Sequence, residues 1–260
     1  MAEVSSLLSQ QDGGVLTLTL ARRKANAFDE ALILELADAL RRAGKDDVVR
    51  CVILTGAGHV FSAGQDISIL AGEERILVRE GLERTYNRLV RQMRALEKPI
   101  LGAINGPAAG AGLGVALATD IRIAARSARF VFGFGGIGLT ADSGISLTLP
   151  VLIGLGRASE MAFTNEPLSA EQALDYGLVN RVVDDADLPG EARAMAERIA
   201  AGAPRAHALT KRAFQRAVLG GLDAALDYEV YLQEAAAKTE DHREGVRAFL
   251  EKRPPLFRGR

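Results

Sequence analysis

Two segments of the sequence could bind a ligand through their main-chain N–H groups. The first, AINGPAAGAGLGVALATD at residues 103–120, has one titratable side chain, Asp120, at its far end. Glycine and alanine let a ligand approach the backbone closely. Helix-forming residues replace the glycines after AGAG, so we expect the first turn of a helix there, where N–H groups lack partners and the helix dipole favours negative charge. The alternative is that the small residues only permit close helix packing.

The second segment, FSAGQDI at residues 61–67, follows a predicted strand and again combines small residues with a glycine. Each of the two segments therefore comes shortly after a strand. Their N–H groups can converge on one carbonyl oxygen as an oxyanion hole, which would stabilise negative charge that develops on that oxygen.

The elements that would position these segments alternate between strand and helix. GVLTLTL at 14–20 alternates apolar and polar residues as a strand does, whereas 28–44 and 81–98 carry apolar residues at helical spacing. Pro99 ends the second helix, and PILGAI at 99–104 suits a strand that is buried on both faces. This pattern predicts an α/β core. Further strands are expected at residues 49–56, 121–125, 128–132 and 178–183, with helices from about residue 145, at 169–177 with Ser169 as N-cap, and almost throughout from Leu188.

Composition excludes several functional classes. The 260 residues carry a formal net charge of −1 with dispersed basic residues, so nothing indicates a surface for nucleic acid or an anionic membrane. The single cysteine, Cys51, lies in the apolar run VRCVIL and fits a buried strand better than a catalytic thiol. We expect a cytoplasmic protein, because the sequence has neither a signal-peptide pattern nor a run of about 18 apolar residues. Gly133, Gly135 and Gly138 match a dinucleotide-binding pattern, but a turn sequence follows them instead of a helix.

Four blocks of the sequence resemble the crotonase, or enoyl-CoA hydratase/isomerase, family. They are VILTGAGHVFSAGQDI, KPILGAINGPAAGAGLGVALATDIRIAA, LSAEQALDYGLVNRVV and GVRAFLEKRPPLFRGR. Members bind an acyl-CoA thioester and stabilise its enolate with two main-chain N–H groups, and the resemblance assigns these donors to Gln65 and Ala111. The substrate contacts that it implies nearby are Ala63, Gly64, Asp66, Gly110, Gly114 and Phe134.

The two glutamates with which hydratases of this family activate water are both missing. Gly114 and Phe134 stand at their positions, and neither can accept a proton, so we do not expect hydration by the two-carboxylate mechanism. Asp142 in LTADSG matches the position where isomerase members, and also aromatic-CoA dehalogenases, keep their acting aspartate. One carboxylate suits isomerisation, because it can take a proton from one carbon of the thioester and return it to another. The alternative for Asp142 is an N-cap of the helix that starts near Ile145.

Histidine placement argues against dehalogenation. The resemblance implies that a dehalogenase has a histidine on the helix that precedes the strand at residues 99–104. Here that helix, at residues 81–98, has Asn87 and no histidine. The three histidines, His59, His207 and His242, lie outside every matched motif, which favours solvated or capping roles for them.

The string RFVFGFGGIGLTADSG resembles the ring 1,2-epoxyphenylacetyl-CoA isomerases of phenylacetate breakdown, which also isomerise Δ3- to Δ2-enoyl-CoA, a reaction of fatty acid catabolism. Two alternatives remain open. The first is an atypical enoyl-CoA hydratase that uses Glu73, Glu74 or Glu80, and the second is a non-catalytic subunit that binds acyl-CoA.

The resemblance also implies a fold, a crotonase-like (ClpP/crotonase) α/β spiral of ββα units followed by a C-terminal helical trimerisation region. We therefore expect a core with the acyl-CoA site at residues 1–190 and a helical region for oligomer contacts at 191–260, in a homotrimer or a hexamer of two trimers. In several members the C-terminal region completes the CoA site of a neighbouring subunit, which implicates Phe249 and Lys252 here. No metal ion or cofactor is implied, because coenzyme A is part of the substrate.

A basic loop follows the strand at residues 14–20. It reads ARRKANAF and lacks the proline that is usual at this point of the family. The loop borders the CoA nucleotide in the family, so Arg22, Arg23 and Lys24 are expected to contact the CoA phosphates. The alternative is that the three side chains are simply solvated.

Overall fold

The computed structural model describes residues 6–69 and 78–260, and within them two sheets form the framework. The large sheet has the strand order β1-β2-β3-β4-β6-β9 and is parallel apart from the β1–β2 hairpin. The small sheet has the order β5-β7-β8. The strands are β1 Leu7–Asp12, β2 Val15–Leu20, β3 Cys51–Gly56, β4 Ile100–Ile104, β5 Ala108–Ala109, β6 Ile121–Ala125, β7 Arg129–Val131, β8 Leu168–Ser169 and β9 Arg181–Val183.

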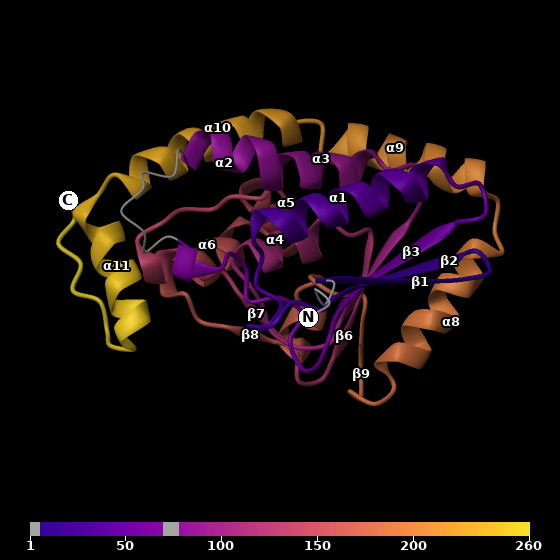
Figure 1. Cartoon of the computed structure of the whole chain (residues 1–260), viewed down its shortest axis with the longest axis horizontal. Coiled ribbons are helices and arrows are strands. Elements are labelled where there is room, and N and C mark those ends of the chain that lie inside the picture. Colours follow the sequence, from indigo (N-terminus) through magenta and orange to yellow (C-terminus); the bar gives the residue numbers. More distant parts are fainter. Residues whose placement is uncertain (1–5, 70–77) are drawn as a thin grey trace, which may run out of the picture.

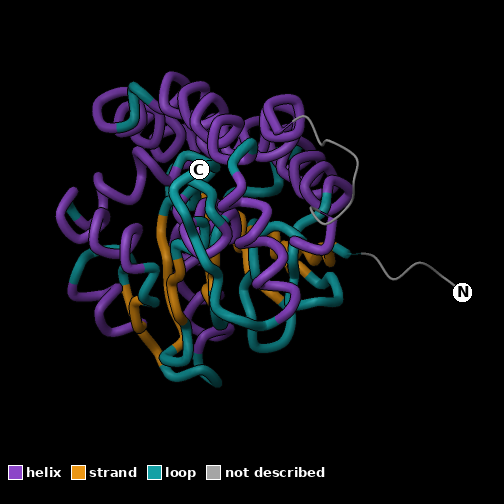
Figure 2. The backbone as a smooth tube through the Cα atoms, turned by 90° about the vertical axis from the view of Figure 1, so that its left-hand side faces the viewer, coloured by secondary structure: helices purple, strands orange, loops and turns teal. Residues whose placement is uncertain are grey.

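Successive ββα units build both sheets. The unit β4–β5–α4 is followed by the unit β6–β7–α5, and each of them gives its first strand to the large sheet and its second strand to the small one. Helices surround the strands (Figures 1 and 2). The predicted spiral of ββα units is thus confirmed. The helices are α1 Glu30–Lys45, α2 Val78–Leu82, α3 Arg88–Ala95, α4 Ala111–Leu117, α5 Ile145–Ile153, α6 Leu155–Thr164, α7 Ala170–Asp175, α8 Leu188–Ala200, α9 Pro204–Val218, α10 Leu222–Ala237 and α11 Glu240–Glu251.

The strand β3 explains how the large sheet is covered on both faces. Its side chains alternate between two separate apolar clusters, because successive residues of a strand point to opposite faces. Val52 and Leu54 lie in the main core with α1 and α3, whereas Cys51 and Ile53 lie in a second cluster with α8. Burial raises the pKa of the Cys51 thiol to about 12, so this cysteine is a structural residue, as predicted.

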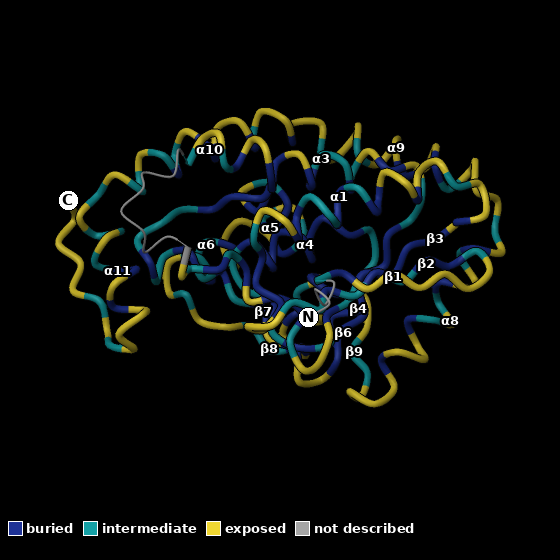
Figure 3. Tube along the Cα trace, in the orientation of Figure 1, coloured by how far each residue is buried: buried dark blue, intermediate teal, exposed yellow. Residues whose placement is uncertain are grey.

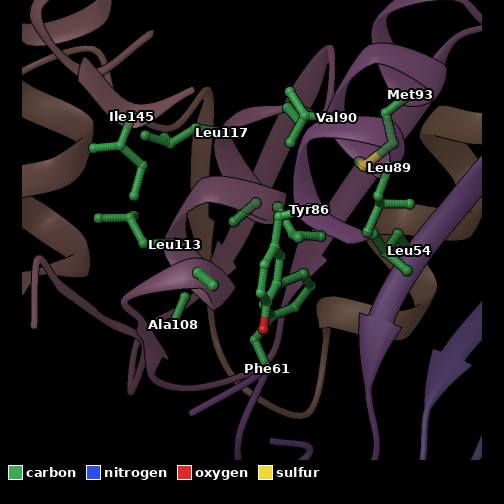
Figure 4. Close-up of a cluster of buried hydrophobic side chains, with 14 of the residues drawn as sticks. Leu54, Phe61, Tyr86, Leu89, Val90, Met93, Ala108, Leu113, Leu117 and Ile145 are labelled. Carbon is green, nitrogen blue, oxygen red and sulfur yellow. The ribbon is translucent and has the colours of Figure 1, made fainter. Parts of the chain in front are cut away.

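The helix predicted at residues 81–98 forms with one irregularity. A π turn, η2 (Glu83–Asn87), stands between α2 and α3 and widens the helix by one residue. The turn brings the ring of Tyr86 into the buried cluster that Figure 4 shows, between side chains of α3 and side chains of α4. Leu89 and Val90 of α3 and Leu113 of α4 belong to the same cluster.

The C-terminal helices lie against the rest of the same chain. Figure 1 shows α10 beside α2, while α11 turns back at the end of the molecule opposite α8. α11 packs on the turn η3 (Gly135–Ile137) so closely that a Cβ atom at Gly245 would lie 2.6 Å from the Ile137 carbonyl carbon. Figure 3 shows that the outer surfaces of α9, α10 and α11 are exposed. No helix among residues 6–69 and 78–260 is long and apolar enough to cross a membrane.

Candidate active site

The loops that follow β3 and β4 run side by side. Because β3 and β4 are parallel neighbours, their carboxyl ends meet at the same edge of the sheet. The Ser62 N–H donates to the Pro107 carbonyl over 3.2 Å, and the Ala109 N–H donates to the Ser62 carbonyl over 3.0 Å. These bonds hold the segments at residues 61–67 and 103–120 together as the sequence predicts.

Gly64 makes the closest approach between the two loops. Its φ is +83°, and a Cβ atom on it would lie 2.6 Å from the Ala109 carbonyl oxygen and 3.3 Å from the Ala111 nitrogen. Only glycine meets both conditions without strain. Gly64 is buried and shapes the backbone instead of touching a ligand through a side chain.

Two backbone N–H groups at this junction have no partner. Across the described part of the chain, neither the Gln65 N–H nor the Ala111 N–H donates a hydrogen bond. Gln65, Ala111, Ala63 and Gly110 all line one cavity of about 610 Å³. Two unpartnered donors on segments that line one cavity can together bind an oxyanion.

The side chain of Asp142 lines the same cavity and is itself buried. Its Oδ1 accepts a hydrogen bond of 2.7 Å from the Ser143 hydroxyl, and its Oδ2 accepts one of 3.0 Å from the Gln233 amide. The alternative role as an N-cap of α5 is wrong. The cap residue is Gly144, and the carboxylate of Glu229 instead accepts the Gly144 and Ser146 N–H groups at 2.8 and 2.9 Å.

Burial is the main influence on the acidity of Asp142. It raises the pKa of this carboxyl from 3.8 to about 7, assisted by the charge of Glu229, while the hydrogen bonds from Ser143 and Gln233 lower it. A carboxyl that titrates near neutral pH can both accept and return a proton at that pH.

The raised pKa of Asp142 should make the free energy of unfolding depend on pH. A carboxyl whose folded-state pKa lies above its ordinary value supports folding fully below pH 3.8, and this contribution is lost as the pH rises to about 7. The Asp142→Asn variant carries no such penalty, so we expect it to be more stable than the wild type at pH 8 by up to about 4 kcal/mol, at about 1.4 kcal/mol per pKa unit. Urea unfolding of both proteins at pH 8 and pH 5 measures the difference. An equal difference at the two pH values would contradict the raised pKa.

Gly114 does not line the cavity, contrary to its predicted place beside the thioester. It lies buried in α4, where a Cβ atom would overlap the Ser143 Cβ and come within 3.3 Å of Ile145. The space beside Gly114 is therefore filled by the turn that carries Asp142.

This packing predicts that even a methyl group at Gly114 is harmful. Gly114→Ala must push the Asp142 turn outward, and overpacking of this kind costs about 1–3 kcal/mol of folding free energy. We expect a lower melting temperature and slower turnover. Gly156→Ala, in the helix α6 with nothing near its Cβ position, is the matched control and should keep normal turnover without lowering the melting temperature. Normal turnover by Gly114→Ala would show that the turn tolerates displacement.

The basic loop is largely occupied by internal ion pairs. Arg22 lies 3.0 Å from the carboxylate of Asp66 and 2.7 Å from that of Asp29, and Lys24 lies 3.4 Å from Asp66. The Ser68 and Arg22 hydrogen bonds hold the pKa of Asp66 at about 2. Asp66 is thus a structural anion that lies outside the residues lining the cavity, not the substrate contact predicted for it. Arg22 is committed to carboxylates, whereas Arg23 and Lys24 are exposed.

The C-terminal region contributes to the cavity of its own chain. Gln233, Ala237, His242 and Phe249 line the cavity, so the site extends beyond residues 1–190. Lys252 caps the end of α11, is exposed and is not among the lining residues. Phe134 lines the cavity as predicted, in edge contact with Phe132 at 5.1 Å between ring centroids.

Four polar residues at the site carried no signal in the sequence. Tyr86 donates to the Gln65 side-chain oxygen over 2.6 Å, and burial raises its pKa well above the ordinary value. His242 lines the cavity with Nδ1 2.8 Å from the Ile137 carbonyl, so that nitrogen carries the hydrogen. Gln233 and Glu229 reach the Asp142 turn from α10. Each belongs to a helical segment apart from the predicted motifs, and only the folded structure brings it to the cavity or to the Asp142 turn.

Of the three carboxylates proposed for an atypical hydratase, the described part of the chain includes Glu80 alone. Glu80 is exposed on α2 and does not line the cavity, and Glu73 and Glu74 lie outside the described residues. Among the described residues, Glu30 is the other carboxylate lining the cavity, and it forms an ion pair of 2.7 Å with Arg84.

Comparison with known proteins gives a consistent result. The family model for enoyl-CoA hydratase/isomerase matches residues 10–260. The chain is 42% identical to the 1,2-epoxyphenylacetyl-CoA isomerase of Escherichia coli over 98% of each chain, and 41% identical to a probable enoyl-CoA hydratase of Rhodobacter capsulatus over 95% of each. A crystal structure of an enoyl-CoA hydratase from Mycobacterium avium subsp. paratuberculosis superposes with a TM-score of 0.90 at 35% identity, covering 98% of this chain and all of that one. The chain therefore belongs to the enoyl-CoA hydratase/isomerase family and has the crotonase fold.

Proposed function

We propose that this protein is an acyl-CoA isomerase in which one aspartate, Asp142, moves the proton. The observation that carries the proposal is a single buried carboxyl, with its pKa raised to about 7, in the cavity that also holds the free N–H groups of Gln65 and Ala111. The hydratase glutamates are replaced by Gly114 and Phe134.

The reaction proceeds in two proton transfers. The thioester oxygen accepts hydrogen bonds from the Gln65 and Ala111 N–H groups. The Asp142 carboxylate removes a proton from the α carbon, and the C–H electron pair delocalises through the thioester to give a dienolate whose negative charge rests on that oxygen. The protonated Asp142 then returns the proton to the γ carbon, and the double bond moves from the 3,4 to the 2,3 position. The enzyme regains its starting state with no water consumed.

We further propose ring 1,2-epoxyphenylacetyl-CoA or a Δ3-enoyl-CoA as the substrate, in phenylacetate or fatty acid catabolism. The relative of 42% identity, named for the epoxide isomerase reaction, supports the first choice. Apolar side chains around Asp142, among them Phe134, Ile137 and Leu139, suit an aromatic or alkyl acyl group. The exposed Arg23, Lys24 and Lys252 remain candidates for the CoA phosphates.

Enoyl-CoA hydration is the second candidate, because relatives named as hydratases reach 41% identity. The test is a substrate panel of a 3-enoyl-CoA, the ring epoxide and crotonyl-CoA, assayed with wild type and Asp142→Asn. We expect isomerisation of the 3-enoyl-CoA or the epoxide to depend on Asp142. Hydration of crotonyl-CoA as the fastest reaction, at a rate unaffected by Asp142→Asn, would favour the hydratase. Tight acyl-CoA binding without any turnover would instead indicate a binding subunit.

A further inference from the structure

The two oxygens of the Asp142 carboxylate have different kinds of hydrogen-bond donor. Oδ1 accepts from the Ser143 hydroxyl at 2.7 Å, and Oδ2 accepts from the Gln233 side-chain amide at 3.0 Å. Both donors are buried, so water does not compete with them. The difference matters for a carboxyl that must alternate between its charged and its neutral form.

The Gln233 amide has a fixed orientation. Its oxygen accepts the Thr140 backbone N–H at 3.1 Å, which leaves the NH₂ group to face Asp142. An amide NH₂ can only donate. Oδ2 of Asp142 is therefore held as an acceptor in both protonation states, and a carbonyl-type oxygen accepts such a bond better than the hydroxyl oxygen of a carboxylic acid does.

The Ser143 hydroxyl, in contrast, is adaptable. A hydroxyl donates to a charged oxygen and accepts from a protonated one after rotation about its C–O bond. The turn that carries it is fixed by its backbone, with φ of +57° at Ser143 and +78° at Gly144. Glu229, one helical turn before Gln233 on α10, holds the same turn through the Gly144 and Ser146 N–H groups.

We propose that Gln233 and Ser143 are positioning residues that assign the moving proton to Oδ1 of Asp142. This inference rests on the proposed function. In the resting carboxylate both residues donate to Asp142. When the carboxylate takes the α proton, Oδ1 becomes the hydroxyl oxygen, the Ser143 hydroxyl turns to accept, and Gln233 keeps its bond to Oδ2. When the proton leaves for the γ carbon, the Ser143 hydroxyl returns to donating.

The assignment gives the C-terminal helix α10 a part in the chemistry. Its residues Glu229 and Gln233 reach the aspartate turn of the same chain, so the helix is more than a surface for oligomer contacts. Within residues 6–69 and 78–260, the other titratable groups that line the Asp142 cavity are Tyr86 from η2, His242 from α11 and Glu30 from α1. The test therefore has to separate the effect of Gln233 from theirs.

The test compares Gln233→Met with wild type in the pH dependence of kcat/KM for a 3-enoyl-CoA. Methionine keeps the volume and removes the donor, so the charged form of Asp142 loses a bond and its pKa rises. We expect the rising limb of the profile to move up by about one pH unit and kcat to fall about tenfold with KM little changed. Gln10→Met, on the exposed strand β1, is the matched control and should leave the profile in place.

A second measurement keeps the test independent of turnover. Titration of the Asp142 carboxyl carbon by ¹³C NMR, identified by its loss in Asp142→Asn, reports the pKa directly. We expect it to rise in Gln233→Met, and to rise in Ser143→Gly as well, where glycine accepts the positive φ. In a single turnover with α-deuterated substrate, Ser143→Gly should still transfer deuterium to the γ carbon. Gln233 still donates to Oδ2 in this variant, so Oδ1 remains the oxygen that carries the deuterium.

The outcomes separate the two proposals. If the wild type neither isomerises nor exchanges the α hydrogen, the proposed function fails, and the NMR titration still decides whether Gln233 controls Asp142. If the wild type isomerises but Gln233→Met leaves both the pH profile and the carboxyl pKa unchanged, the positioning role is overturned. If Gln233→Met does not fold, Gln233→Glu keeps the acceptor for Thr140 and should raise the pKa of Asp142 through its added charge, and no rise would overturn the inference.

Discussion

Asp142→Asn is expected to slow isomerisation about a hundredfold or more, the usual contribution of a general base. Asparagine has the same shape as aspartate but cannot take up the α proton. Its oxygen can still accept from Gln233 while its NH₂ group donates to the Ser143 oxygen, so both hydrogen bonds survive with the amide in one orientation. The loss should therefore appear in kcat, and the variant should fold at least as stably as the wild type.

Binding of a saturated acyl-CoA is the control for this variant. It needs the cavity and the two N–H donors but no proton transfer, so the dissociation constant of Asp142→Asn should match that of the wild type within about threefold, or less than 1 kcal/mol. A variant that binds normally and retains more than a tenth of the wild-type rate would show that another group moves the proton.

The second large effect is expected from Ala111→Pro. Proline removes the N–H that we assign to the oxyanion hole, and its ring is tolerated at the first position of a helix such as α4. Loss of one oxyanion donor lowers kcat by about 10²- to 10³-fold. Ala111→Gly keeps the N–H and is the matched control, for which we expect near-normal turnover.

The pH profile distinguishes this variant from Asp142→Asn. Because Ala111→Pro leaves the Asp142 carboxyl and its partners in place, the rising limb of kcat/KM should stay at the wild-type pH while its height falls. If Ala111→Pro kept wild-type activity, the Ala111 N–H would not bind the thioester oxygen, and the placement of the acyl group would have to be revised.

The main strands and helices could be predicted because the order of apolar and polar side chains along the sequence differs between strands and helices. Alternation in VLTLTL and full burial in ILGAI correspond to β2 and β4, and the capping box of Ser169 and Gln172 forms as expected. The strand β1 was not predicted. Its residues are almost all exposed, so the pairing with β2 that makes it a strand leaves no apolar pattern to read.

The candidate site was predictable where the backbone carries the chemistry. Gln65 and Ala111 lie on the segments that follow β3 and β4, and parallel neighbouring strands bring such segments together. The ion-pair partners that the tertiary fold brings to a side chain could not be predicted from the sequence. Arg22 was expected at a phosphate and instead pairs with Asp29 and Asp66, which lie on other elements of the fold.

The C-terminal region shows the same limit. Its helical character followed from the sequence, but apolar periodicity does not say whether a helix covers its own chain or a neighbouring one. Here α10 and α11 line the cavity of their own chain through Gln233, His242 and Phe249. The homotrimer or hexamer stays a prediction, which the exposed apolar residues Leu209, Phe214 and Val218 of α9 make reasonable.

The central claim, that one carboxyl carries the proton from the α to the γ carbon, is tested most directly by isotope transfer. A 3-enoyl-CoA deuterated at the α carbon is converted in ordinary water in a single turnover, and the product is analysed for deuterium at the γ carbon. Because Asp142 is buried, exchange with solvent is slowed, and we predict deuterium at the γ carbon with wild type and none with Asp142→Asn. A γ hydrogen drawn wholly from solvent in the wild type, or transfer that persists in the variant, would contradict a single-aspartate shuttle.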